Sequence, residues 1–193
     1  MKIYRVLASE NGVTCCYAKD NRFSVLDFEN HYDVYMDADK PLEDWNKLHF
    51  YTSTTINKRK RFNNIMRHNV MFYMVDESSK MIIEKEFSDC IQFLEAVNND
   101  DPLTKYYFLY PFRGIEGLDI DKSKCDFLPN SKIYTSVSKY IFRKDVEYCP
   151  VFKLKSDGKA YDTRMYVTDE FKDFIESNGI TGLRFEEIFD FED

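Results

Sequence analysis

A short segment of this chain recurs 84 positions later, and this recurrence constrains the fold more than any other feature. Residues 81–91 read MIIEKEFSDCI and residues 165–175 read MYVTDEFKDFI, with Met, Glu-Phe, Asp and Ile in register. Each copy has the pattern of a short strand, a polar cap and an amphipathic helix, followed by an aromatic-rich strand. One such unit cannot bury its apolar face alone, so two copies predict a doubled scaffold with a shared core.

The predicted fold class is therefore α+β, with mixed sheets and two related strand–helix–strand units. The first helix is expected over 86–97, where apolar side chains recur at helical spacing. The second is expected over 169–178, with Thr168 or Asp169 capping its exposed N–H groups. Gly179 follows at the position that favours left-handed dihedrals after a helix.

The length and composition bound the domain organisation. The chain has 193 residues, of which 44% are hydrophobic and 17% aromatic, enough for a packed core. A chain of this length suits a single domain over residues 1–193. The alternative division is two lobes, 1–112 and 113–193, that share one core.

Acidic residues are concentrated in two stretches of a chain whose formal net charge is −7. Residues 27–44 hold seven acids against one lysine, and residues 186–193 hold five acids. Such charge attracts a basic partner and repels nucleic acid and anionic membranes, although it also serves solubility alone. Tyrosine among carboxylates is typical of protein-binding surfaces. The predicted partner-binding residues are Asp33, Tyr35, Asp37, Asp39, Glu186, Glu187 and Asp190.

The cysteines and the apolar runs indicate the compartment. The five cysteines are odd in number and show no CxxC spacing. The N-terminal stretch has no apolar core of the kind found in signal peptides, and no apolar run approaches the roughly 18 residues of a membrane span. The sequence therefore predicts reduced thiols, a cytoplasmic location and no membrane partner.

Motifs for catalysis, metals and nucleic acid are weak. The stretch DIDKS (119–123) begins like a calcium loop but lacks the required glycine and glutamate, so a turn is the better interpretation. The basic run 58–61 lacks interleaved aromatic residues, and the three histidines lack zinc-ligand spacing. A Cys–His pair assembled from distant residues, such as Cys90 with His49, stays open as an alternative. We expect no metal, no cofactor and no nucleic acid partner.

The second half carries a more specific pattern. In order it reads YYFLYPF, GLDIDKS, YIFRKD, CPVFKL and YVTDEFKDFIESNGITGLRFEEI. This order resembles the immunity proteins of bacterial polymorphic toxin systems, in the large family first catalogued as a domain of unknown function. The matching residues are Leu118, Asp119, Ser123, Ile141, Phe142, Arg143, Val151, Phe152, Phe171, Gly179, Thr181, Gly182, Leu183 and Phe185.

The resemblance implies a non-catalytic protein that binds and neutralises a cognate toxin encoded beside it. From the acidic charge we further expect a cationic toxin such as a nuclease, because charge pairing speeds association and sets specificity. Two alternatives from other classes stay open. One is a small cytoplasmic hydrolase or transferase that uses a Cys/His or carboxylate pair, and the other is a DNA mimic or phage-derived inhibitor.

Overall fold

The structure is a computed structural model that describes residues 1–9, 14–16, 40–43, 47–53, 63–68, 73–127, 129–130, 134–156, 159–160 and 164–192. Within these residues the chain forms two helices, α2 (Glu77–Phe87) and α3 (Asp169–Ser177). The strands of the same residues are β1 (Lys2–Ala8), β2 (Thr14–Cys16), β3 (Leu48–Ser53), β4 (Ile65–His68), β5 (Tyr73–Asp76), β6 (Ile91–Asn98), β7 (Lys105–Pro111), β8 (Gly114–Ile115), β9 (Lys124–Phe127), β10 (Tyr134–Lys139), β11 (Val151–Ser156), β12 (Lys159–Ala160), β13 (Tyr166–Thr168) and β14 (Leu183–Asp190).

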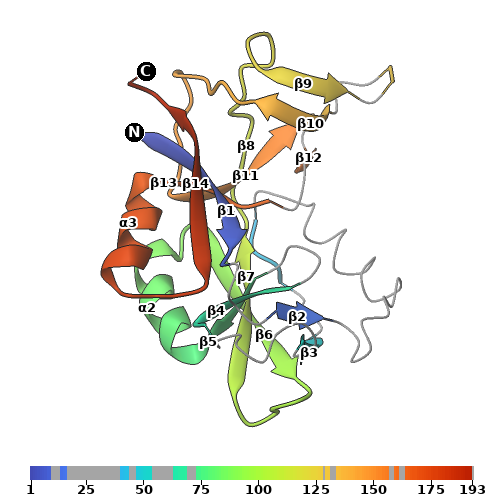
Figure 1. The fold of residues 1–193 in the computed structure, drawn as a ribbon, viewed down its shortest axis with the longest axis vertical. Coiled ribbons are helices and arrows are strands. Elements are labelled where there is room, and N and C mark those ends of the chain that lie inside the picture. Colours follow the sequence, from blue (N-terminus) through green and yellow to red (C-terminus); the bar gives the residue numbers. More distant parts are fainter. Residues whose placement is uncertain are drawn as a thin grey trace.

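The strands form three groups that are stacked along the long axis of the molecule (Figure 1). A closed barrel of β2-β3-β6-β7-β5-β4 lies at one end. The central sheet runs β12-β11-β13-β1-β14, with β8 pairing beside β11. The short β9–β10 pair lies at the opposite end from the barrel. The predicted α+β class with mixed sheets is confirmed, and strands predominate.

The N-terminal strand β1 lies between two strands from the end of the chain. It pairs antiparallel with β13 on one side and with β14 on the other. Along β14 the pairing skips one residue, because Ile3 faces Phe189 whereas Tyr4 faces Glu187. Ile188 is therefore an extra residue in β14, which is the arrangement of a β-bulge. The described chain ends meet here, where the Phe191 N–H donates to the Met1 carbonyl at 3.0 Å.

The two helices lie side by side and cover one face of the central region (Figure 1). Their shared core joins side chains from distant parts of the sequence, including Val6 of β1 and Val151 of β11. Phe87 of α2 and Phe171 of α3 meet at its centre, with ring centroids 5.1 Å apart. A second core fills the barrel, and a third, rich in aromatic rings, lies beneath the β9–β10 end. The proposed division into domains or lobes stays a prediction.

The first predicted helix is wrong in position. Residues 81–83, expected as a strand, lie inside α2, and most of 86–97 is the barrel strand β6. The helix begins earlier because Asp76 caps it, accepting a hydrogen bond from the Ser79 N–H at 2.7 Å. Seven consecutive register pairs join β6 to β7. Strand pairing in the barrel therefore overrides the helical spacing of the apolar residues in β6.

The second predicted helix is confirmed to within one residue. Its C-terminus has the expected glycine: Gly179 has a φ of 65°, and the Gly179 and Ile180 N–H groups donate to the carbonyls of Glu176 and Ile175. These two bonds are those of a Schellman motif. Thr168 stands at the N-cap position, but its side chain makes no capping hydrogen bond. Each helix lies between two strands, and a relationship between the two units stays a prediction.

Candidate partner-binding site

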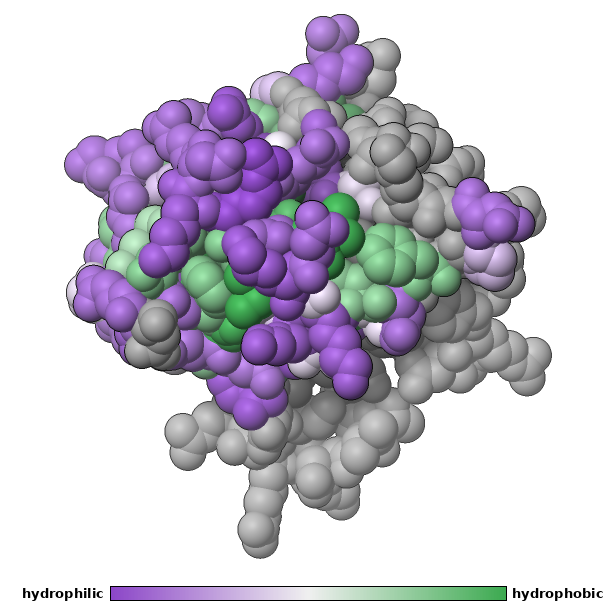
Figure 2. Space-filling view, turned by 90° about the horizontal axis from the view of Figure 1, so that it is seen from above, coloured by the Kyte–Doolittle hydropathy of each residue, from purple (hydrophilic) through white to green (hydrophobic). Residues whose placement is uncertain are grey.

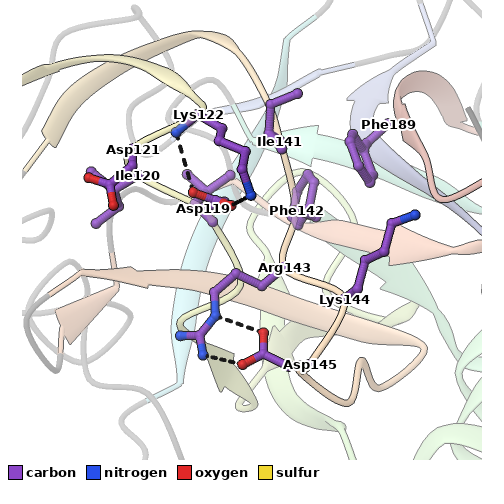
Figure 3. A pocket seen from close by; sticks show the side chains of 11 residues that line it. Asp119, Ile120, Asp121, Lys122, Ile141, Phe142, Arg143, Lys144, Asp145 and Phe189 are labelled. Carbon is purple, nitrogen blue, oxygen red and sulfur yellow. Dashed lines mark hydrogen bonds and ion pairs between the residues drawn. The ribbon is translucent and has the colours of Figure 1, made fainter.

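A cavity of about 730 Å³ opens at the β9–β10 end of the molecule, and we call it the apical groove. Its walls come from 118–122, which precede β9, from 141–145, and from Phe189 of β14. Figure 3 shows Ile120 and Asp121 on one side of this cavity, and Lys144 and Phe189 on the other.

Backbone pairing holds the two main walls together. Leu118 and Phe142 form an isolated antiparallel bridge. On either side of it, the Asp119 N–H donates to the Ile141 carbonyl at 2.9 Å, and the Arg143 N–H donates to the Gly117 carbonyl at 2.8 Å. The walls are therefore fixed relative to each other by main-chain bonds, which do not depend on side-chain identity.

Ser123 closes the same frame with its side chain. Its hydroxyl accepts from the Ile141 N–H at 3.0 Å and donates to the Ile141 carbonyl at 3.1 Å. Its own N–H donates to the Asp119 carbonyl at 2.8 Å, which forms the turn expected for DIDKS. These bonds explain in structural terms why the family-like elements LD…S and IFR occur together.

Tyr148 contacts both walls next to the Leu118–Phe142 bridge. Its hydroxyl lies 2.9 Å from the carbonyl oxygens of both Gly117 and Arg143, which share its single proton. Burial raises the pKa of Tyr148 to about 12, so the phenol keeps its proton at neutral pH. A Cβ atom at Gly117 would lie 2.7 Å from the Tyr148 ring, so glycine is required for this close approach.

The floor of the apical groove is apolar. Leu118 and Phe142 are buried, and the Phe142 and Phe189 rings lie 5.4 Å apart. Ile120 stands at the edge with 44% of its surface exposed. Seen from this end of the molecule, apolar side chains form a patch bordered by hydrophilic ones (Figure 2). An apolar floor inside a polar border is the arrangement of protein-binding sites.

Two ion pairs near the surface line the walls, one on each (Figure 3). Lys122 and Asp119 are 2.6 Å apart, and the hydrogen bond from Lys122 lowers the pKa of Asp119. Arg143 binds Asp145 through two nitrogens, at 3.1 and 2.7 Å, and this contact lowers the pKa of Asp145. Exposed pairs of this kind contribute little to stability, so their charges are available to a partner.

Asp121 and Lys144 add one further charge to each side. Both are exposed, and neither has a carboxylate–amine contact within 4 Å among the described residues. Lys144 instead donates to the Phe191 carbonyl at 3.3 Å. The groove is thus acidic at the Asp121 edge and basic at the Lys144 edge.

The thiols of Cys90 and Cys149 lack the features of a catalytic nucleophile. The Sγ atoms of Cys90 and Cys149 donate to the backbone carbonyls of Phe87 and Val151. Burial raises the pKa of Cys149 to about 11 and also raises that of Cys90. Both therefore stay protonated at neutral pH, whereas catalytic thiols need a lowered pKa.

A second cavity, of about 890 Å³, lies beside Cys149. Four carboxylates from separate segments line it together with Arg113. Within the described part of the chain, no group of three or more His, Cys, Asp or Glu side chains could hold a metal ion.

The predicted contact residues fall into two groups. Asp33, Tyr35, Asp37 and Asp39 lie outside the described residues. Glu186, Glu187 and Asp190 lie on β14.

The β14 acids are paired with bases of β1. Arg5 donates from Nε to Glu186 at 2.8 Å. Lys2 lies 2.8 Å from Glu187 and 3.6 Å from Asp190. The hydrogen bond with Glu187 raises the pKa of Lys2 to about 12.

The sequence did not predict Ile120, Lys144 and Phe189 as site residues, because only the fold brings them together at the apical groove.

Taken together, the fold and the apical groove define a mixed α+β protein with a surface suited to a macromolecular partner. A model of the immunity protein family Imm11 matches residues 8–190, so the chain belongs to that family. This membership supports an immunity role and implies a toxin partner in general terms. A search of curated proteins gave no match. No helix among the described residues is long and apolar enough to cross a membrane.

Proposed function

We propose that this protein neutralises a cognate toxin domain by binding it stoichiometrically, without catalysis of its own. The observation that carries the proposal is the match to the immunity protein family over residues 8–190. The apical groove supports it, because an apolar floor with charged edges suits a protein surface. The raised pKa of the described buried thiols also favours binding over thiol chemistry.

The proposal places the protein in the cytoplasm of a bacterium that carries a polymorphic toxin system. Its partner would be a basic toxin domain, and neither nucleic acid nor membrane would be bound. The formal net charge of −7 supports a basic partner. The acidic stretch with Asp33, Tyr35, Asp37 and Asp39 and the β14 acids Glu186, Glu187 and Asp190 stay part of the proposal as regions that steer association.

Co-expression tests this function directly. The toxin domain encoded by the gene beside this one is expressed in a bacterial host with and without this protein. We expect growth arrest by the toxin alone and normal growth when both are present, with the two proteins co-purifying in a fixed ratio. Growth arrest that persists although the protein is soluble and folded contradicts the proposal. Rescue by catalytic amounts, with turnover of a small compound, would favour the hydrolase or transferase alternative.

A further inference from the structure

Several large apolar side chains of the described residues reach the surface, but one differs from the others in its setting. Leu103 and Met81 are the most exposed, at 94% and 66%, on the β6–β7 turn and on the outer side of α2. Neither residue lines the apical groove, the cavity beside Cys149 or a smaller cavity beside Asn64 and Asp76. Ile120 borders the apical groove, where an incoming side chain would find buried apolar neighbours. Contacts in such concave, apolar places contribute most to binding energy.

We infer that the toxin docks through a protruding segment that inserts a large apolar side chain into the apical groove, between Ile120 and Phe189. The same segment carries a basic residue toward Asp121 and an acidic residue toward Lys144. This inference rests on the proposed function, because it names the surface and the chemistry of the partner that the function requires.

The charges of the groove select this kind of occupant. Three acids and three bases line it, so a polyanion such as nucleic acid gains no net attraction there. A polypeptide can present both signs at once, and the opposite charges at the two edges fix the direction in which it crosses. Asp121 and Lys144 form no ion pair with other described residues, so binding a partner breaks no such contact.

The frame beneath the groove also favours tight docking. The walls are held by the Leu118–Phe142 bridge and by the bonds of Ser123, so little ordering is needed when a partner arrives. Preorganised sites lose less conformational entropy on binding.

The test measures binding of the purified toxin domain from the neighbouring gene to the full chain and its variants, by surface-binding kinetics. Ile120→Asp places a charge in the apolar groove and should weaken binding by roughly tenfold or more. Lys144→Glu places a like charge opposite the acidic residue of the docking segment and should weaken binding several-fold at low salt, with a smaller difference at high salt.

Leu103→Asp and Met81→Asp are the matched controls, because they make the same kind of change at exposed apolar sites. The β6–β7 turn lies at the opposite end of the molecule from β9 (Figure 1). Both control variants should bind like the unaltered protein. Thermal melting of each variant confirms that it is folded. Hydrogen exchange on the complex of the unaltered proteins adds a readout without substitutions, with protection expected at 118–122 and 141–145.

The outcomes separate the two proposals. Failure of the unaltered protein to bind the toxin overturns the proposed function and the inference with it. Tight binding that Ile120→Asp and Lys144→Glu leave unchanged, with no protection at the groove, overturns the inference and leaves the function standing. Loss of binding in Met81→Asp alone assigns docking to the outer side of α2, which also overturns the inference.

Discussion

The two helices α2 and α3 carry the same Glu-Phe pair at opposite ends. In α2, Phe87 is the last residue of the helix, whereas in α3, Phe171 is the third. Both rings are buried and they contact each other at 5.1 Å. The recurring Glu-Phe pair therefore places both rings in the same core, although it falls at different positions within the two helices. Likeness in sequence can reflect a common packing requirement when the local structures differ.

The ends of the helices differ in how they are fixed. Asp76 caps α2 and accepts three hydrogen bonds, from the Ser79 N–H, the Ser78 hydroxyl and the Asn64 amide. Thr168 makes no such bond for α3.

At the beginning of α3 the next residue, Asp169, binds β1 instead. Its carboxylate accepts from the Lys2 N–H at 2.7 Å and from the Tyr4 hydroxyl at 3.0 Å. The start of α2 is thus set largely by nearby residues, and that of α3 by a strand far away in sequence.

The largest expected effect concerns the turn after α3. Gly182 has a φ of 113°, and a Cβ atom there would lie 1.9 Å from the Ile65 carbonyl oxygen. Gly182→Ala combines backbone strain with overlap against rigid backbone, so we expect a loss on the order of 4–6 kcal/mol in the free energy of unfolding. At Gly179 nothing lies within 4 Å of the added atom, so Gly179→Ala should lose only about 1–2 kcal/mol. Denaturant titration of both variants checks the comparison, and equal losses would contradict it.

The second prediction breaks the contact between the helices. Phe87→Ala removes a buried ring from the shared core and should lower the free energy of unfolding by about 3–5 kcal/mol. Phe171→Ala should have a similar effect, because the two rings share that core. In the double variant the losses should fall short of additivity by about 0.5–1.5 kcal/mol, the coupling of an aromatic pair. Strict additivity in denaturant titrations would show that the rings do not interact.

The third prediction compares the two caps. Asp76→Ala removes the cap of α2 and should lower the free energy of unfolding by about 1–2 kcal/mol. Thr168→Val keeps the shape of the side chain and removes only a hydroxyl that makes no capping bond, so we expect a loss below about 0.5 kcal/mol. The measurement is again denaturant titration. A larger loss for Thr168→Val than for Asp76→Ala would reverse the assignment of the caps.

The smallest effect is a pH dependence of the same cap. Burial would raise the pKa of Asp76, but hydrogen bonds from Ser79, Asn64 and Ser78 outweigh it and lower the pKa. The folded state thus favours the charged carboxylate, whose contribution is full above the unfolded pKa of about 3.9 and is lost as pH falls through the folded pKa. The difference in stability between the unaltered protein and Asp76→Ala should therefore shrink below about pH 4. A difference that stays constant between pH 6 and pH 2.5 would contradict this account.

Elements with strong local signals could be predicted from the sequence. The helix predicted over 169–178 and the glycine that follows it are confirmed. There the helical spacing of the apolar residues and the left-handed dihedrals that glycine allows restrict the backbone locally. The region 81–97 could not be predicted, because its apolar residues fit helical spacing while the barrel requires a strand there. Asp76 followed by an acidic residue was the overlooked signal for the start of α2.

The groove itself could be predicted only in part. The family-like motifs contain Asp119, Ile141, Phe142 and Arg143, which the structure brings together in the apical groove. Phe189 joins them from the other end of the chain, and only the pairing of β14 with β1 brings it there. Contacts across long sequence separations depend on the assembled sheet, so local patterns do not report them.

The extra residue Ile188 in β14 has a consequence for recognition. Before it, Phe185 faces the helices; after it, Ile188 and Phe189 both join the aromatic core on the other side. The bulge thus reverses the alternation of side chains along β14. As a result, the Phe189 ring faces the apical groove and not the helices. If β14 alternated without the bulge, the same residues would place the Phe189 ring on the side of Phe185, and the apical groove would lose that wall.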